Sequence, residues 1–146
     1  MTAYASHLAA ELNFTHIDTG AMYRCVAYEA MRREMDLTDS GALATLAHQM
    51  DIRFGETAKN SELSEETSFG QRVYIGGEDV TDAIRSPEVS RKTTQVANVP
   101  GVRAELSHLQ RELGLKGRAV LEGRDIGTVV MPEAVWKIYL VASLDE

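Results

Sequence analysis

Apolar residues recur at helical spacing over several stretches of the chain. Met22, Val26 and Ala30 stand four residues apart and therefore share one face of a helix. Other segments show similar stripes, or are rich in strong helix formers such as alanine and leucine. The predicted helices cover residues 3–12, 21–34, 40–50, 87–98 and 100–113.

Continuous apolar runs with β-branched residues predict buried strands. Residues 118–124 and 135–143 have this composition, and residues 14–18 form a shorter candidate that ends at Asp18. Strands that are buried on both faces are typical of parallel sheets. The alternation of such strands with helical segments favours an α/β fold.

The middle of the chain has a different character. Residues 51–54 alternate between polar and apolar, and residues 71–81 alternate around Gly76–Gly77, which is a hairpin signal. The polar, acidic residues 55–70 predict a loop or a long hairpin tip. We therefore expect a small antiparallel α+β region, residues 37–85, inserted into a core domain.

Capping residues mark several of the expected boundaries. Ser86 and Pro87 have the types preferred at an N-cap and at the first helical position. Gly114 is expected to end the last helix, and Thr19–Gly20 to form the turn after the first strand. On this division the core domain comprises residues 1–36 and 86–146.

Composition and charge narrow the classes of partner. The chain of 146 residues is 44% hydrophobic and 25% charged, with a formal net charge of −7. Nucleic acids and anionic membranes need a basic face, so neither is expected as a partner. The lone cysteine, Cys25, fits a reducing cytoplasm. The four histidines have no metal-ligand spacing, and no metal site is predicted from them.

Both ends of the chain predict a larger domain. The sequence opens in a helical stretch without a preceding strand or cap, and it stops directly after a strand-like run. A domain normally continues past a buried strand, so we expect the chain to be truncated.

Polar and charged residues follow two of the predicted parallel strands. Asp18, Thr19 and Gly20 follow the first, and Glu122 to Asp125 follow the second; a third strand end falls at Ser143–Glu146. Ligands of open α/β sheets bind beyond the carboxyl ends of the strands. Guanidinium groups bind phosphate oxygens in bidentate fashion, so Arg24 and Arg124 indicate a phosphate-bearing small molecule.

Four segments together carry a family resemblance. "IDTGAMYR", "LEGRDIGTVV" and "KIYLVAS", in this order and at these separations, closely resemble bacterial cytidylate kinases, which are P-loop nucleoside monophosphate kinases. "RSPEVSRKTTQVANVPGVRAEL" is similar to the family's segment that precedes the strand with the G-R-D motif, which is residues 123–125 here. The resemblance covers essentially the whole chain. It implies a three-layer parallel sheet with flanking helices, incomplete here, and an inserted monophosphate-binding region.

The resemblance also implies a reaction and a site. The γ-phosphoryl group of ATP, with Mg²⁺, would pass to CMP or dCMP. The resemblance also implies that the protein is a cytoplasmic monomer. Arg24 and Arg124 would hold the CMP phosphate as the catalytic arginines. The remaining CMP-binding residues implied by the family are Asp18, Thr19, Tyr23, Thr94, Arg103 and Asp125. Of these, Thr94, Arg103 and Asp125 would read cytosine, and the family usually has serine where Thr94 stands.

Two parts of the family pattern do not occur in the sequence. They are the phosphate-binding loop G-x-x-x-x-G-K-[ST] and the arginine-rich lid after "VAS". Thr2 is at most a remnant of the loop, so the cofactor-binding residues are unknown. Catalysis in this class rests on positioning and on clamping by lysine, arginine and magnesium. We therefore expect the chain alone to be nearly inactive and to retain mainly CMP binding.

Other interpretations stay open at this point. The chain could be a non-catalytic nucleotide-binding module, or a related kinase for UMP, AMP or a shikimate-like acid. Single residues also have simpler roles: Asp125 could cap the following turn, and Thr94 could bond its own helix backbone. Arg24, Arg103 and Arg124 could be ordinary surface charges, and Tyr23 could serve packing alone.

Overall fold

The computed structural model describes residues 2–55 and 71–141, with the side chain of Thr2 not among the described parts. The chain opens with α1 (Thr2–Leu12), β1 (Thr15–Asp18) and α2 (Thr19–Arg32), followed by α3 (Ser40–Gln49) and β2 (Ile52–Phe54). After the gap come β3 (Val73–Ile75), β4 (Glu78–Asp79), the 3-10 turn η1 (Ala83–Arg85) and α4 (Pro87–Ala97). The described part ends with α5 (Pro100–Leu115), β5 (Ala119–Glu122) and a short π-helical segment, η2 (Ile126–Val130).

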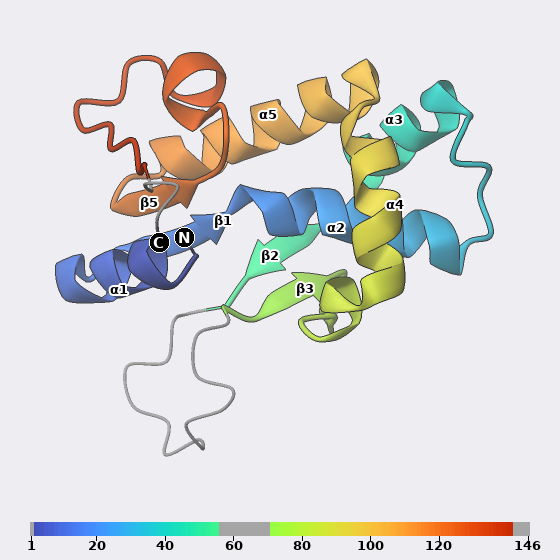
Figure 1. Ribbon diagram of the computed structural model, residues 1–146, viewed down its shortest axis with the longest axis horizontal. Coiled ribbons are helices and arrows are strands. Elements are labelled where there is room, and N and C mark those ends of the chain that lie inside the picture. Colours follow the sequence, from blue (N-terminus) through green and yellow to red (C-terminus); the bar gives the residue numbers. More distant parts are fainter. Residues whose placement is uncertain (1, 56–70, 142–146) are drawn as a thin grey trace.

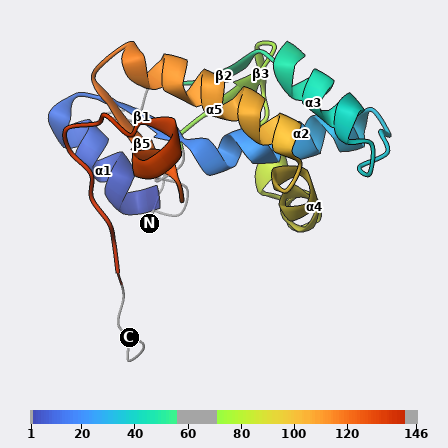
Figure 2. The ribbon, with the colours of Figure 1, turned by 90° about the horizontal axis from the view of Figure 1, so that it is seen from above.

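The two sheets are of different kinds. β1 pairs in parallel with β5, and Asp18 lies opposite Glu122 at the end of the ladder. β2, β3 and β4 form an antiparallel sheet in that order. α1 and α5 both contact β5, and the parallel pair lies between these helices (Figure 2). The predicted α/β class, with an antiparallel insertion, is confirmed.

The inserted region shares its hydrophobic core with the rest of the molecule. Leu43, Ile75 and Val80 from residues 37–85 belong to the same buried cluster as Met22 and Leu106 from the core helices. Figure 1 shows the antiparallel strands lying beside α2, which runs through the centre of the molecule. The proposed boundaries at 37 and 85 stay a prediction, since one continuous core crosses both.

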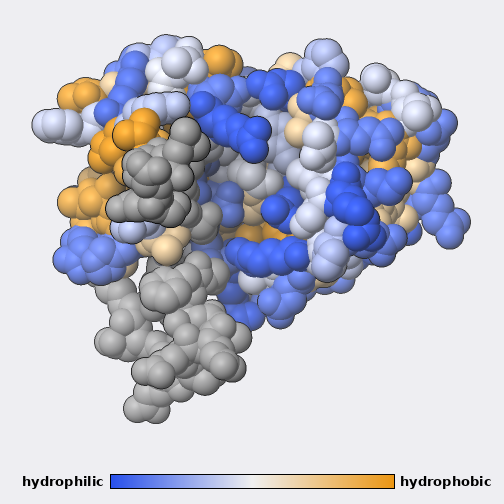
Figure 3. Space-filling model, in the orientation of Figure 1, coloured by the Kyte–Doolittle hydropathy of each residue, from blue (hydrophilic) through white to orange (hydrophobic). Residues whose placement is uncertain are grey.

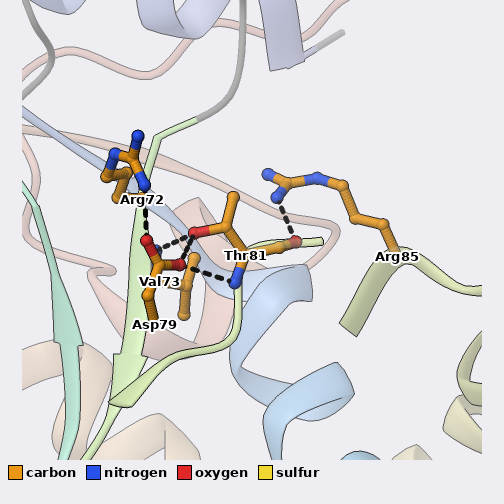
Figure 4. Close-up of polar contacts among 5 residues, drawn as sticks. All are labelled: Arg72, Val73, Asp79, Thr81 and Arg85. Atoms are coloured by element: carbon orange, nitrogen blue, oxygen red, sulfur yellow. Dashed lines mark hydrogen bonds and ion pairs between the residues drawn. The ribbon is translucent and has the colours of Figure 1, made fainter. Parts of the chain in front are cut away.

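Side chains fasten the hairpin to the segment before α4. The Asp79 carboxylate accepts hydrogen bonds from the backbone N–H of Thr81 at 3.0 Å and from its hydroxyl at 2.6 Å. The Thr81 hydroxyl oxygen accepts from the backbone N–H of Val73 at 2.9 Å. Arg72 pairs with Asp79, and Arg85 donates to the Thr81 carbonyl oxygen (Figure 4). Because β4 is only two residues long, these bonds continue the pairing beyond the strand.

Most predicted helix and strand positions are confirmed, with three corrections. Thr19 and Gly20 do not form a turn but begin α2, because the Asp18 side chain caps this helix by accepting from Ala21 N at 3.1 Å. Gly114 lies inside α5, where it packs near Leu121; the chain reverses at Gly117, whose φ is +84°. Only a glycine adopts that φ without strain.

The third correction concerns the predicted strand at residues 135–143. Its described part, residues 135–141, is not a strand and is largely exposed, with Trp136 88% and Tyr139 89% accessible. Figure 3 shows apolar surface over this end of the molecule. A strand forms only by pairing with a neighbour, and none of the described strands pairs with this run. The predicted third strand end, Ser143–Glu146, lies outside the described residues.

Candidate functional site

The parallel pairing of β1 and β5 brings two polar strand ends together. Asp18 and Thr19 follow one strand, and Gly123, Arg124 and Asp125 follow the other, so both meet at one sheet edge. The Thr19 hydroxyl donates to the Glu122 carbonyl oxygen at 2.6 Å and ties the two ends directly. A Cβ on Gly123 would lie 2.3 Å from Thr19 Oγ1, so only glycine fits this approach. The convergence predicted from the sequence is therefore present.

Arg103 and Asp125 form an ion pair across this edge. Arg103 Nη2 at the start of α5 lies 2.7 Å from Asp125 Oδ2, and both side chains remain partly exposed. Asp125 does not cap the following turn, because its side chain makes no capping bond to η2. The two residues expected to read a base are thus neighbours and present a donor and an acceptor together.

Tyr23 lies close to the same pair. Burial raises the pKa of the Tyr23 hydroxyl above its usual range. The Arg103 charge and the Gln110 side chain oppose this rise, whereas the charge of Asp125 adds to it. These interactions connect α2 with both members of the ion pair. Tyr23 is therefore part of the site's surroundings as well as of the packing.

Arg24 carries a positive charge that no acidic group balances among the described residues. Its Nη1 donates to the Ser90 hydroxyl oxygen at 2.6 Å and to the Ile84 carbonyl oxygen at 3.4 Å. Both partners are neutral, and the Arg24 side chain is only partly exposed. A guanidinium group in this setting is free to bind an anion, which would supply the missing negative charge.

Arg124 is exposed, and no hydrogen bond or ion pair joins its side chain to the described part of the chain. It follows Gly123 directly and precedes Asp125, so it extends from the strand end that forms the site. Arg24 and Arg124 thus supply two guanidinium groups that have no acidic partner among the described residues.

Thr94 lies one turn after Ser90 on α4. It is exposed, and its hydroxyl is not bonded to the helix backbone; the neighbouring Thr93 makes such a bond instead, to the Val89 carbonyl oxygen at 2.8 Å. Since residues four apart share a helix face, Thr94 lies on the side of α4 that meets Arg24 through Ser90. The structure does not join Thr94 to Arg103 or Asp125.

Three residues of this region did not emerge from the sequence patterns. They are Ser90, which binds Arg24, Gln110, which is buried beside Tyr23, and His16, which binds Glu122. The spacing of four residues between Ser90 and Thr94 could have indicated Ser90, because residues four apart share one face of a helix. His16 and Gln110 had none, because their partners are distant in the sequence.

Two further features bear on the kind of site. Within the described ranges, no group of three or more histidine, cysteine, aspartate or glutamate side chains could hold a metal ion. None of the described helices combines the length and apolar character that crossing a membrane would need.

Comparisons with known proteins place the chain in a family. The family model described as cytidylate kinase matches residues 2–146. A cytidylate kinase of Pelotomaculum thermopropionicum is 48% identical over 95% of this chain, and one of Desulfitobacterium hafniense is 44% identical over 97%. A bifunctional pantoate ligase/cytidylate kinase of a Synechococcus species is 46% identical over 99% of the chain and is matched over 26% of its own length.

The chain spans 58% of the length of the Pelotomaculum protein and 56% of the Desulfitobacterium protein. The resemblance seen in the strand-end motifs is thereby confirmed over almost every residue. The chain belongs to the cytidylate kinase family.

Proposed function

We propose that this chain carries the CMP-binding part of a cytidylate kinase. The whole protein would transfer the γ-phosphoryl group of ATP to CMP or dCMP. The observation that carries the proposal is the shared edge of β1 and β5. There the Arg103–Asp125 pair lies beside two strand ends, and Arg24 and Arg124 have no acidic partners among the described residues.

The chemistry of CMP suits these groups. Arg24 and Arg124 would bind the phosphate, whose charge replaces the acidic partners they lack. Cytosine presents an amino donor and two acceptors, so the Asp125 carboxylate would accept from the amino group, while Arg103 and the Thr94 hydroxyl would donate to the acceptors. A site that hydrogen-bonds a base discriminates strongly, because an unmatched base leaves buried polar groups unpaired.

Asp18, Thr19 and Tyr23 would shape the pocket rather than react. Asp18 is occupied with capping α2, and the Thr19 hydroxyl is occupied by the Glu122 carbonyl oxygen. Thr19 would fix the two strand ends relative to each other, and Asp18 would fix the start of α2. Tyr23, whose pKa is raised by burial, stays protonated at neutral pH and offers a hydroxyl beside the ion pair.

We propose ATP as the second substrate, with Mg²⁺ bound to its phosphates, and a cytoplasmic monomer as the working form. We assign no residue of this chain to the metal ion. The sequence holds no G-x-x-x-x-G-K-[ST] loop, and in this class a loop lysine and clamping arginines supply most of the rate. The 146-residue chain should therefore show negligible turnover. A coupled ADP assay with turnover close to that of a complete cytidylate kinase would contradict this.

A thermal-shift titration tests the binding site directly. A ligand at a hundredfold excess over its Kd stabilises the folded chain by about 2.7 kcal/mol, which corresponds to a rise in Tm of roughly 5–10 °C at this size. We expect this rise with CMP, and a much smaller one with UMP or AMP. Equal responses to all three nucleotides, or to none, would refute the proposed site.

Matched arginine variants sharpen the same experiment. Arg124→Gln removes a charge-assisted bond worth about 1.5–3 kcal/mol, so the Kd for CMP should rise by roughly 10-fold to 150-fold. Arg118→Gln is the control, because Arg118 is also exposed but lies at the opposite end of β5. Equal CMP affinities of the two variants would remove Arg124 from the site.

A further inference from the structure

A buried histidine lies directly behind the proposed site. His16 in β1 is 0% exposed, and its Nε2 lies 3.1 Å from Oε2 of Glu122 in β5. In the parallel ladder His16 is opposite Val120, whereas Asp18 is opposite Glu122. The bond therefore runs diagonally between the strands. His16 stands two residues before Asp18, which lies at the edge where the ligand would bind.

The chemistry of the bond indicates which ring nitrogen of His16 is the donor. An ionised carboxylate only accepts hydrogen bonds, so Nε2 must carry the proton. The other ring nitrogen, Nδ1, is buried and finds no hydrogen-bond partner in the described part of the chain. The backbone carbonyl oxygen of His16 accepts from the Gln71 side chain, which anchors the same residue from the inserted region.

Two side chains of the described residues consequently hold Glu122. His16 binds its carboxylate, and the Thr19 hydroxyl binds its carbonyl oxygen at 2.6 Å. The next residues are Gly123, Arg124 and Asp125. Because the carboxylate and the backbone carbonyl of Glu122 are both held, the direction in which these residues leave β5 is fixed as well. The same bond turns one carboxylate oxygen toward a fully buried ring, away from an arriving phosphate that it would repel.

We propose that His16, as the Nε2–H tautomer, is a positioning residue for CMP binding: through Glu122 it orients Gly123–Asp125. The inference rests on the proposed function but concerns a residue that does not touch the ligand. Its effect on affinity passes through the Arg124 guanidinium group and the Asp125 carboxylate, whose places depend on the end of β5.

Two substitutions at one position separate positioning from packing. His16→Leu fills similar space without a donor, whereas the amide nitrogen of His16→Gln can reach the place of Nε2 and donate to Glu122. His48→Leu is the matched control, because His48 forms an exposed pair with Glu105 at 2.9 Å. The readouts are the Kd for CMP by calorimetry and the amide hydrogen exchange of residues 123–125 without ligand.

We expect His16→Leu to raise the Kd for CMP at least tenfold and to speed amide exchange at residues 123–125. His16→Gln should recover most of both losses, and His48→Leu should change neither. A nitrogen NMR spectrum of the wild-type ring should show a proton on Nε2. If His16→Leu fails to fold, the His16→Gln variant and the ring spectrum test the proposal. His16→Gln must then stay close to the wild type in its Kd for CMP and in the amide exchange of residues 123–125.

Three results would overturn the inference: a wild-type ring without a proton on Nε2, a Gln variant as impaired as the Leu variant, or unchanged exchange at residues 123–125 in His16→Leu. Failure of the proposed function looks different. In that case the wild-type chain itself does not bind CMP, while the ring spectrum and the exchange data still report on whether His16 orients the strand end.

Discussion

Replacing Gly123 by alanine tests the close approach between the two strand ends. The added Cβ would lie 2.3 Å from Thr19 Oγ1 and 2.9 Å from Ile126 Cδ1, so at least one neighbour must move. Thr19 is buried and its hydroxyl holds the Glu122 carbonyl oxygen at 2.6 Å. A shift of Thr19 that relieves the clash therefore breaks this hydrogen bond.

The expected cost combines both effects. Gly123 itself is exposed, but its added methyl group would press on the buried Thr19. Overpacking costs about 1–3 kcal/mol, and the lost hydrogen bond adds about 0.5–1.5 kcal/mol. We expect Gly123→Ala to lower the free energy of unfolding by about 2–4 kcal/mol. In a Thr19→Ala background the main clash and the bond are already gone, so the same substitution should cost at least about 1 kcal/mol less.

Urea unfolding followed by far-UV circular dichroism measures all four members of this cycle. Gly41→Ala is the control: its Cβ meets Asp39 Oδ1 at an ordinary 3.5 Å in the first turn of α3, so helix propensity should make it neutral or stabilising. Additive effects of the Gly123 and Thr19 substitutions, within about 0.5 kcal/mol, would refute the proposed contact.

Three other predictions concern the helices and the buried thiol. Gly101→Ala should destabilise by about 1–3 kcal/mol, because its Cβ would lie 2.6 Å from Ala44 Cβ where α5 meets α3; an Ala44→Gly partner that restores nothing would contradict this in the same unfolding assay. Ser86→Ala removes the side-chain cap of α4 and should cost about 1 kcal/mol of unfolding free energy, whereas Ser86→Asp should keep it. Burial raises the pKa of the Cys25 thiol from 9.0 to about 12, so the folded chain should resist a thiol reagent at pH 8. The unfolded thiol ionises first, so Cys25 should reduce stability between pH 9 and 12 by up to about 1.4 kcal/mol per pH unit; a Cys25→Ala variant with the same pH profile would count against this.

Local signals explain why most of the fold could be predicted. Ser86 and Pro87 mark a helix start by side-chain type alone, and α4 begins there with the Ser86 oxygen accepting from Val89 N. Gly76 and Gly77, with φ of +56° and +87°, make the turn between β3 and β4. Asp18 carried the same kind of signal for α2, and reading it as a cap would have corrected the start of that helix.

The wrong predictions concern features that depend on contacts with residues distant in the sequence. Residues 135–141 have the composition of a buried strand, but composition does not supply the neighbouring strand that a ladder needs. Gly114 shows the same limit for helices: a glycine near a helix end is a good stop signal, yet here tertiary packing against Leu121 favours its place inside α5.

The candidate site likewise contains residues that local patterns predict and pairs of residues that only the folded structure brings together. Asp18, Thr19, Arg124 and Asp125 were found because parallel strands end at a common edge, a rule that needs no distances. The pairing of Arg103 with Asp125 and of Arg24 with Ser90 joins residues 22 and 66 positions apart, and only the folded structure brings them together. The roles proposed for these residues, and for Thr94, stay predictions until CMP binding is measured.

The exposed residues 135–141 after η2 also provide an intrinsic fluorescence probe. Trp136 is the only tryptophan in the sequence, and it is 88% accessible within this run. Because its indole ring is largely exposed to solvent, we expect its fluorescence emission at the long-wavelength end of the tryptophan range. Any polypeptide that covers residues 135–141, whether a further part of a longer chain or another molecule, will shift that emission to the blue without the need for a label.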